Sequence, residues 1–262
     1  MMQPTRQHWD DDSVTPPATT EVARLELAAL CRLLARERLT PIGGARIAAR
    51  DPENQSSYLI HPAAPLFEEA KPSGMVTVDR DGVHQDTRER EPDAGTLAIV
   101  LAALEARSDA AAAALIASTA GCVVASLEVG LLPITQTAFM FHGAIGTLDV
   151  DPEADSDAIR RGVADALGDG RALLVRGRGL LVCGETLAQT WKLLFFLDKC
   201  CRSQVAAMAA ANSAGTPLTI PSEEVVTHAV AQSRGFVEHP RYVADWPSFL
   251  DQLDREDPSW RE

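Results

Sequence analysis

The sequence predicts an α/β sandwich, and three observations carry this prediction. Segments with the periodicity of strands alternate with segments that have the periodicity of helices. The chain has 262 residues, which is enough to bury one sizeable core. No segment repeats another. Residues 1–18 are polar, acidic and proline-containing, which predicts a mobile N-terminal tail, and residues 19–262 are expected to form a single domain.

The domain is predicted to begin with a helix and to continue into short strands. Thr19 or Thr20 can cap this helix, because a threonine hydroxyl accepts hydrogen bonds from the N–H groups of the first turn. The apolar face of the helix comprises Val22, Leu25, Ala29, Leu30, Leu33 and Leu34. Turns are expected at Gly43–Gly44 and Asp81–Gly82, and extended segments around Ile47, at Tyr58–Ile60 and at Met75–Val78.

The remainder of the chain is predicted to alternate between helices and buried strands. Apolar runs of four to nine residues predict the strands, and longer segments with a period near 3.6 predict the helices. The strands are expected at Ala110–Ser118, Ile145–Val150, Ala172–Val175 and Leu180–Cys183, the last two joined by a turn at Gly177–Gly179. The helices are expected at Thr96–Arg107, Gly121–Leu127, Asp155–Leu167, Leu187–Ala211, Pro221–Ser233 and Trp246–Arg255.

Charge and hydropathy exclude several classes of partner. The formal charge of −13 would repel nucleic acid and anionic membranes, so neither is expected to bind. No apolar run approaches the roughly 20 residues of a membrane span. The first residues lack the apolar core of a signal peptide, which predicts a cytoplasmic protein with a small-molecule partner.

The cysteines and histidines do not form a metal or disulfide motif. The five cysteines have no regular spacing and include no C-x-x-C, so buried reduced thiols are expected. The six histidines include no pair separated by two, three or four residues. They are His8, His61, His84, His142, His228 and His239.

Five segments, in order, resemble the class II aldolase/adducin family, and together they cover roughly residues 22–260. Leu30–Pro52 (LCRLLARERLTPIGGARIAARDP) resembles its opening helix and glycine turn, and Tyr58–Gly82 resembles the strand, proline turn and Pro-Ser segment that follow. Glu105–Gln136 resembles the metal-binding strand region. Arg171–Gln204 resembles the strand-turn-strand of the last ligand with its long helix, and Trp246–Trp260 resembles a tail found in one bacterial branch.

The resemblance implies a three-layer sandwich with a central, mainly antiparallel sheet flanked by helices. It also implies a homotetramer with sites at the subunit boundaries. In the family, three histidines hold a zinc-like ion that stabilises an enediolate, and a glutamate moves protons. Two of the histidines form a His-x-His on one strand, so that both face the ion.

The family's metal ligands are missing from this chain. The His-x-His pair falls on Leu115 and Ala117, the third histidine on Arg178, and the glutamate near Thr96. Leucine and alanine have no lone pair to donate, and arginine is a permanent cation that repels a metal. The sequence therefore predicts no metal and no cofactor.

The positions of the family's phosphate pocket are also altered. Arg46 replaces an asparagine, Ala63 and Ala64 replace a Thr-Gly pair, and Ala94 and Gly95 replace two serines. The pocket becomes more apolar, and we expect it not to hold a sugar phosphate. Arg46 could still pair with a carboxylate or an enolate.

These positions predict a metal-independent site in which cations and hydroxyls stabilise an oxyanion. The candidate catalytic residues are Arg178, His142 and Thr96, and the candidate substrate-binding residues are Arg46, Ser73, Ser118, Thr119, Gln136 and Thr137. Several of these residues could instead have a purely structural role. Arg178 could form an ion pair, and His142 could be a turn residue. Thr96 and Ser118 could be helix caps or strand hydroxyls, and Arg46 could support its own glycine turn. Trp191, Phe195 and Phe196 are interpreted as core or subunit contacts.

Two functions from different classes follow. The first is a repurposed enzyme, a metal-independent lyase, cyclase, isomerase or decarboxylase acting on an apolar carbonyl or carboxylate compound, in bacterial secondary metabolism. The second is a pseudoenzyme, a non-catalytic binding or scaffold protein like the adducin head domain. A conventional metal aldolase would require ligands that the sequence lacks.

Overall fold

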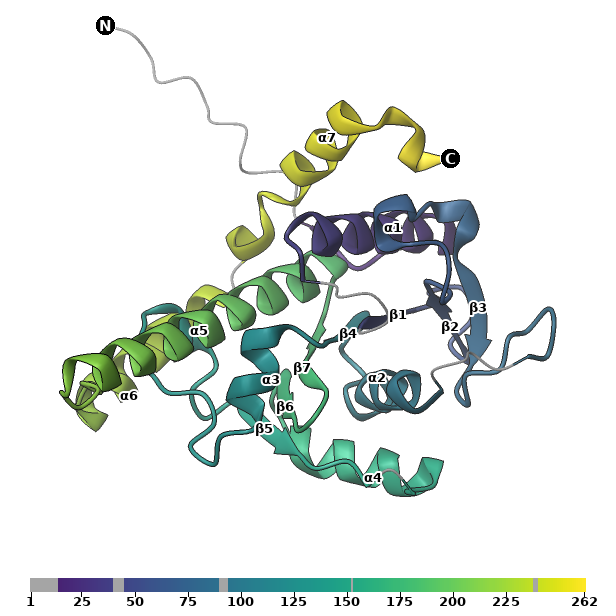
Figure 1. The fold of residues 1–262 in the computed structure, drawn as a ribbon. Coiled ribbons are helices and arrows are strands. Elements are labelled where there is room, and N and C mark those ends of the chain that lie inside the picture. The colour runs from purple at the N-terminus through teal and green to yellow at the C-terminus, as the bar shows by residue number, and fades with distance from the viewer. Residues whose placement is uncertain (1–13, 40–44, 90–93, 152, 238–239) are drawn as a thin grey trace, which may run out of the picture.

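The computed structural model describes residues 14–39, 45–89, 94–151, 153–237 and 240–262. Its centre is a seven-stranded sheet of order β3-β2-β1-β4-β7-β6-β5, in which all neighbours are antiparallel except β5 and β6 (Figure 1). The strands are β1 (Ala45–Arg50), β2 (Ser57–Ile60), β3 (Val76–Asp79), β4 (Ala112–Ile116), β5 (Ile145–Leu148), β6 (Ala172–Val175) and β7 (Gly179–Gly184). The predicted α/β class with a mainly antiparallel sheet is confirmed.

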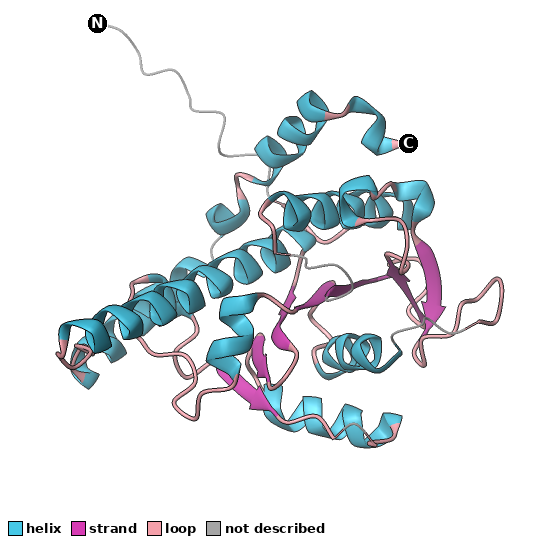
Figure 2. Cartoon of the chain, viewed as in Figure 1, coloured by secondary structure: helices cyan, strands magenta, loops and turns pink. Residues whose placement is uncertain are grey.

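Helices cover both faces of the sheet, which makes the three layers (Figure 2). The helices are α1 (Thr20–Arg36), α2 (Ala94–Ala106), α3 (Thr119–Ala125), α4 (Ser156–Leu167), α5 (Leu187–Ala214), α6 (Glu223–Val237) and α7 (Trp246–Glu256). Short 3-10 turns are η1 (Phe67–Glu69), η2 (Pro72–Gly74), η3 (Thr137–Met140), η4 (Pro240–Val243) and η5 (Pro258–Arg261). Alternate residues of each strand face opposite layers.

The protein has two separate apolar cores, one on each face of the sheet. Buried side chains of α1, α3, α5 and α7 form one core with Ile47, Ala114 and Val182 of the sheet. Buried side chains of α2 and α4 form the other, with Leu115 and Leu181. β4 lies between β1 and β7 and is buried along its whole length, which is why its alanine-rich sequence holds a strand.

The predicted elements are confirmed, with shifts at their ends. Thr19 caps α1 by accepting from the Val22 N–H, as expected. The strand predicted at Ala110–Ser118 is shorter, because the Ser118 hydroxyl accepts from the Gly121 N–H and so begins α3. The turn predicted at Gly43–Gly44 lies outside the described residues, as do residues 1–13 of the predicted tail.

The predicted apolar face of α1 needs one correction. Val22 is 40% exposed, whereas Leu27 is fully buried. Successive helical residues are rotated by about 100°, so a face centred on Leu27, Leu30 and Leu34 turns Val22 toward solvent.

The cysteines are free thiols, as predicted, and all except the half-buried Cys122 are buried. Burial raises the pKa of the Cys183 and Cys200 thiols to about 11. Within the described residues, no helix is long and apolar enough to cross a membrane.

Glu26 of α1 is an acidic side chain in an unfavourable environment. Burial raises the pKa of its carboxyl group to about 7, and the Trp246 indole of α7 lowers it by a smaller amount. Glu26 Oε2 and Trp246 Nε1 are both buried without a hydrogen-bond partner of normal geometry. Ionisation of Glu26 in this buried position therefore destabilises the folded protein.

We predict that Glu26→Gln stabilises the protein above pH 7 and has little effect near pH 4. The folded-state pKa lies above the unfolded value of 4.5, so the wild type loses stability as pH rises from 4.5 to 7. Above pH 7 the penalty is complete, at about 3 kcal/mol. Denaturant titrations at the two pH values measure the free energy of unfolding. Glu21→Gln, an exposed position on the same helix, is the control; an equal gain there would contradict the prediction.

Candidate functional site

The candidate site lies at the end of the sheet where β1 begins, β4 ends and β7 begins. Arg46 is directly opposite Leu115, and Leu115 is opposite Leu181. The three side chains belong to alternate positions that face the α2 layer. Ala117 is the first residue after β4, and by the alternation of strand side chains it lies on the same face of the sheet as Leu115.

Arg178 is held at this end by the glycine that follows it. Gly179 has φ +117°, and a Cβ there would lie 2.1 Å from the Ile116 carbonyl oxygen and 3.0 Å from Ala117 Cα. Only glycine allows the start of β7 to approach the end of β4 so closely. The turn therefore places Arg178 beside the position where the family resemblance expects the His-x-His pair.

Arg178 and Thr96 are in contact, which brings two of the predicted catalytic residues together. Arg178 Nη1 donates a hydrogen bond of 2.8 Å to Thr96 Oγ1 in the first turn of α2. Both side chains are half-buried. Arg178 forms no ion pair with any carboxylate among the residues that the structure describes.

Arg46 is a second cation at the same end of the sheet. It is only 8% exposed, its Nη1 donates to its own neighbour Ala45 O at 3.0 Å, and its buried Nε has no hydrogen-bond partner. Among the described carboxylates, none pairs with it. A buried guanidinium that lacks a counter-ion is costly, and a bound anion would offset that cost.

The residues at this end do not fit the family's metal ion. Leu115 and Ala117 offer no lone pair, and the guanidinium of Arg178 has donors only. Thr96 contributes one hydroxyl, which already accepts from Arg178. The described residues contain no group of three or more His, Cys, Asp or Glu side chains that could hold a metal.

In the part of the chain that the structure describes, the remaining candidates form no hydrogen bond or ion pair with Arg178. Ser118 caps α3, Thr119 is exposed at the start of that helix, and Ser73 is exposed in η2, which packs on α1. Gln136 and Thr137 line a hollow of about 440 Å³ with Phe196 of α5, and they lie on the opposite side of the sheet from α2.

His142 and the predicted aromatic cluster also lie on the α5 side. His142 is exposed in the turn after η3. Ala138 of η3 and Phe141, the residue that follows η3, belong to the α5-side core. Trp191 is buried and packs its ring 5.5 Å from that of Phe195, which agrees with the interpretation of this cluster as core.

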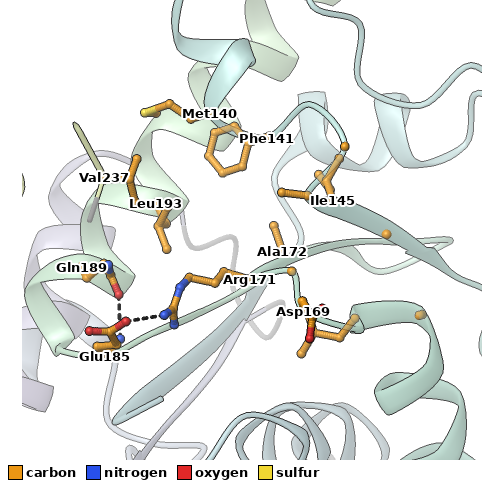
Figure 3. A pocket seen from close by; sticks show the side chains of 16 residues that line it. Met140, Phe141, Ile145, Asp169, Arg171, Ala172, Glu185, Gln189, Leu193 and Val237 are labelled. Carbon is orange, nitrogen blue, oxygen red and sulfur yellow. Dashed lines mark hydrogen bonds and ion pairs between the residues drawn. The ribbon is translucent and has the colours of Figure 1, made fainter. Parts of the chain in front are cut away.

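The sequence analysis missed a larger hollow of about 700 Å³ (Figure 3). Near it, Arg107 and Arg171 bind the same carboxylate of Asp109 at 2.8 and 2.9 Å, and Arg171 also pairs with Glu185. The hydrogen bond from Arg107, with the charge of Arg171, lowers the pKa of Asp109 to about 2. In the sequence, only Arg171 and Glu185 adjoin buried strands, directly before β6 and directly after β7, and nothing there links them to Arg107 and Asp109.

Comparison with known proteins agrees with this architecture. Residues 25–205 match the sequence model of the class II aldolase and adducin N-terminal domain. A Caulobacter vibrioides protein, named provisionally as aldolase class 2, is 30% identical over 92% of either chain. Gamma-adducin of Mus musculus is 27% identical over 82% of this chain, but over only 31% of its own length.

A solved structure gives the same result. The crystal structure of an aldolase II superfamily protein from Pseudomonas syringae superposes with a TM-score of 0.84 and 28% identity, covering 94% of this chain and 97% of that one. The chain belongs to the class II aldolase and adducin N-terminal domain family.

We predict that Leu115→His, Ala117→His and Arg178→His together create a zinc site. Positions 115 and 117 face the same side of the sheet, and the turn at Gly179 brings position 178 next to them. Metal analysis by mass spectrometry is expected to find about one zinc per subunit. The variant that carries only the first two histidines is the control and is expected to bind zinc far more weakly. A folded triple variant without zinc would show that the three positions do not converge.

Proposed function

We propose that the chain is a repurposed enzyme of this fold that stabilises an enolate or similar oxyanion without the family's metal. The observation that supports the proposal is the contact between Arg178 and Thr96. The family resemblance assigns a metal ligand to position 178 and the proton-transferring glutamate to a position near Thr96. The substrate is an apolar carbonyl or carboxylate compound, in keeping with the methyl groups that replace the family's polar ligands.

Arginine can take over the electrostatic part of the metal's task. A guanidinium is permanently charged and presents several N–H donors in one plane, so it can bind an oxygen that gains negative charge in the transition state. Thr96 fixes the orientation of the guanidinium by accepting from Nη1, which leaves other N–H groups for the substrate. Fixed donors of this kind need no rearrangement as the charge develops.

Arg46 is proposed to bind a carboxylate of the same substrate. It lies two strands from β7, roughly 10 Å away across the sheet, with the side chain of Leu115 between. A carboxylate would provide the missing counter-ion of Arg46 while the neighbouring carbonyl oxygen reaches Arg178. Cyclisation, isomerisation, carbon–carbon bond cleavage and decarboxylation can each proceed through such an enolate, and a role in bacterial secondary metabolism is consistent with an apolar substrate.

The proposal includes a homotetramer with sites at the subunit boundaries. Gln136, Thr137 and His142 lie on the α5 side of the sheet, away from Thr96 of the same protomer. In the proposed tetramer a neighbouring subunit contributes these side chains, with His142 as the candidate acid or base. Ser73, Ser118 and Thr119 are retained as candidate substrate contacts at the boundary.

A non-catalytic binding protein is the second candidate, and the adducin relationship favours it. Gamma-adducin aligns with most of this chain at 27% identity. The replacement of four catalytic positions is equally expected of a domain that only binds. The two candidates make different predictions about reaction rates. An enzyme accelerates proton removal or bond cleavage in its substrate, whereas a scaffold binds its partner without accelerating either.

We predict that the wild type catalyses hydrogen–deuterium exchange at C3 of an apolar 2-oxo acid, such as 4-methyl-2-oxopentanoate, in D2O. The exchange requires an enolate, whose charge Arg178 would stabilise. Arg178→Ala is expected to slow the exchange by about 10²- to 10³-fold, the usual cost of removing an oxyanion donor. Proton NMR measures the loss of the C3 signal.

Arg176→Ala provides the matched control. Arg176 lies in the same turn, but its side chain pairs with Asp149 at 3.3 Å and is expected to have no part in exchange. A wild type that binds oxo acids of several chain lengths without accelerating exchange would contradict the enzyme proposal and favour the binding protein.

A further inference from the structure

The first turn of α2 lies next to both terminal nitrogens of the Arg178 guanidinium. Nη1 donates a hydrogen bond of 2.8 Å to Thr96 Oγ1. At the preceding residue, Gly95, a Cβ would lie 3.8 Å from Nη2. Two neighbouring positions of one helix therefore determine the surroundings of this cation, Thr96 through its hydroxyl and Gly95 through the lack of a side chain.

The backbone does not require a glycine at position 95. Its φ is not in the left-handed region. Among the described residues, apart from its chain neighbours and its own helix, only Arg178 comes within 4 Å of a Cβ placed there, and 3.8 Å is ordinary van der Waals contact. Gly179 differs on both counts, with φ +117° and a Cβ that would lie 2.1 Å from the Ile116 carbonyl oxygen. Alanine would fit at position 95 without moving any of these residues.

Glycine is also unfavourable for the helix itself. Gly95 is the second residue of α2 and is exposed to solvent. Glycine loses more conformational freedom than alanine when it enters a helix, so it lowers the stability of the helix. Neither a special φ nor a close contact with a described residue compensates for this loss. The fold therefore gives no reason for glycine at this position.

The space at Gly95 lies beside the guanidinium that is proposed to bind the oxyanion. Because Thr96 holds Nη1, the place of Nη2 relative to α2 is also fixed. A group that binds Nη2 from this side occupies the volume that a side chain at position 95 would fill. The size of residue 95 therefore controls which molecules can approach Arg178 from this side.

We propose that Gly95 is a specificity-determining residue, which gives substrates with a branched apolar group access to Arg178. The inference rests on the proposed function and narrows its substrate class to 2-oxo acids that carry such a group on C3, as 4-methyl-2-oxopentanoate does. A larger residue at position 95 would restrict the site to the smallest oxo acids. Gly95 acts by leaving space and takes no part in proton transfer.

The test compares 4-methyl-2-oxopentanoate with pyruvate, which carries no group on C3, in the wild type and in Gly95→Val. Isothermal titration measures binding, and proton NMR in D2O measures exchange at C3. Gly95→Val is expected to weaken binding and slow exchange of the branched acid about tenfold, the usual effect of a small change in pocket volume, and to change pyruvate less than about twofold. An equal loss for both acids, or no loss for either, would overturn the proposal.

Two further variants separate a role in specificity from a role in the fold. Gly95→Ala is expected to melt at a higher temperature than the wild type, because alanine is the better helix former and fits the space. A lower melting temperature would show that the fold needs this glycine and would overturn the proposal. Ala106→Val changes an exposed position at the other end of α2 and is expected to leave the binding of both acids unchanged. An equal effect there would mean that valine acts through the helix, and the proposal would be wrong.

Binding and exchange together distinguish failure of this inference from failure of the enzyme proposal. If the wild type binds both acids without exchange and Gly95→Val loses only the branched acid, the enzyme proposal is wrong but Gly95 still selects ligands. If the wild type catalyses exchange and Gly95→Val does not discriminate between the acids, the enzyme proposal stands and this inference is wrong. A wild type that binds neither acid overturns the inference, since it names these acids as ligands.

Discussion

The structure depends on the central position of β4 between two strands and two apolar cores. β4 pairs with β1 on one side and β7 on the other, and its residues alternate between the α5 layer and the α2 layer. At its end, the missing side chain of Gly179 lets β7 approach the Ile116 carbonyl group. This close approach fixes where Arg46, Leu115 and Arg178 can lie relative to one another. A change of residue type at these positions therefore changes the chemistry of the site without changing its frame.

Much of the fold could be predicted from the sequence, because the central strands are short continuous apolar runs and the helices are longer apolar or amphipathic segments. The ends of strands and helices were less predictable where a single hydrogen bond determines them. Ser118, for example, was expected to end a strand, but its hydroxyl caps α3. The 3-10 turns η1 to η5 were missed because three or four residues carry no periodic signal. The exposure of Val22 shows that a helix can be predicted from its period although the side that faces the core is predicted less accurately.

The candidate site was predictable in part. Laying the chain over the family pattern named Arg178 and Thr96 as separate candidates, and the hydrogen bond between them is seen only in the structure. The burial of Arg46 and its lack of a described counter-ion could not be read from the sequence, since they depend on how β1 packs. The placement of His142 on the α5 side also depends on the path of the chain after α3. The charged network around Asp109 joins three segments that are distant in sequence, so spacing gives no sign of it.

We propose that cations and a hydroxyl, rather than a metal, act at the end of the sheet where β7 begins. The most direct test is mass-spectrometric analysis of metals in the purified wild type after expression with zinc, manganese, iron and cobalt supplied. We expect a metal-to-subunit ratio near zero, because Leu115, Ala117 and Arg178 offer no ligand. A stoichiometric ratio would contradict the account, since it would mean that other side chains form a metal site and that the metal-dependent chemistry of the family applies to this protein.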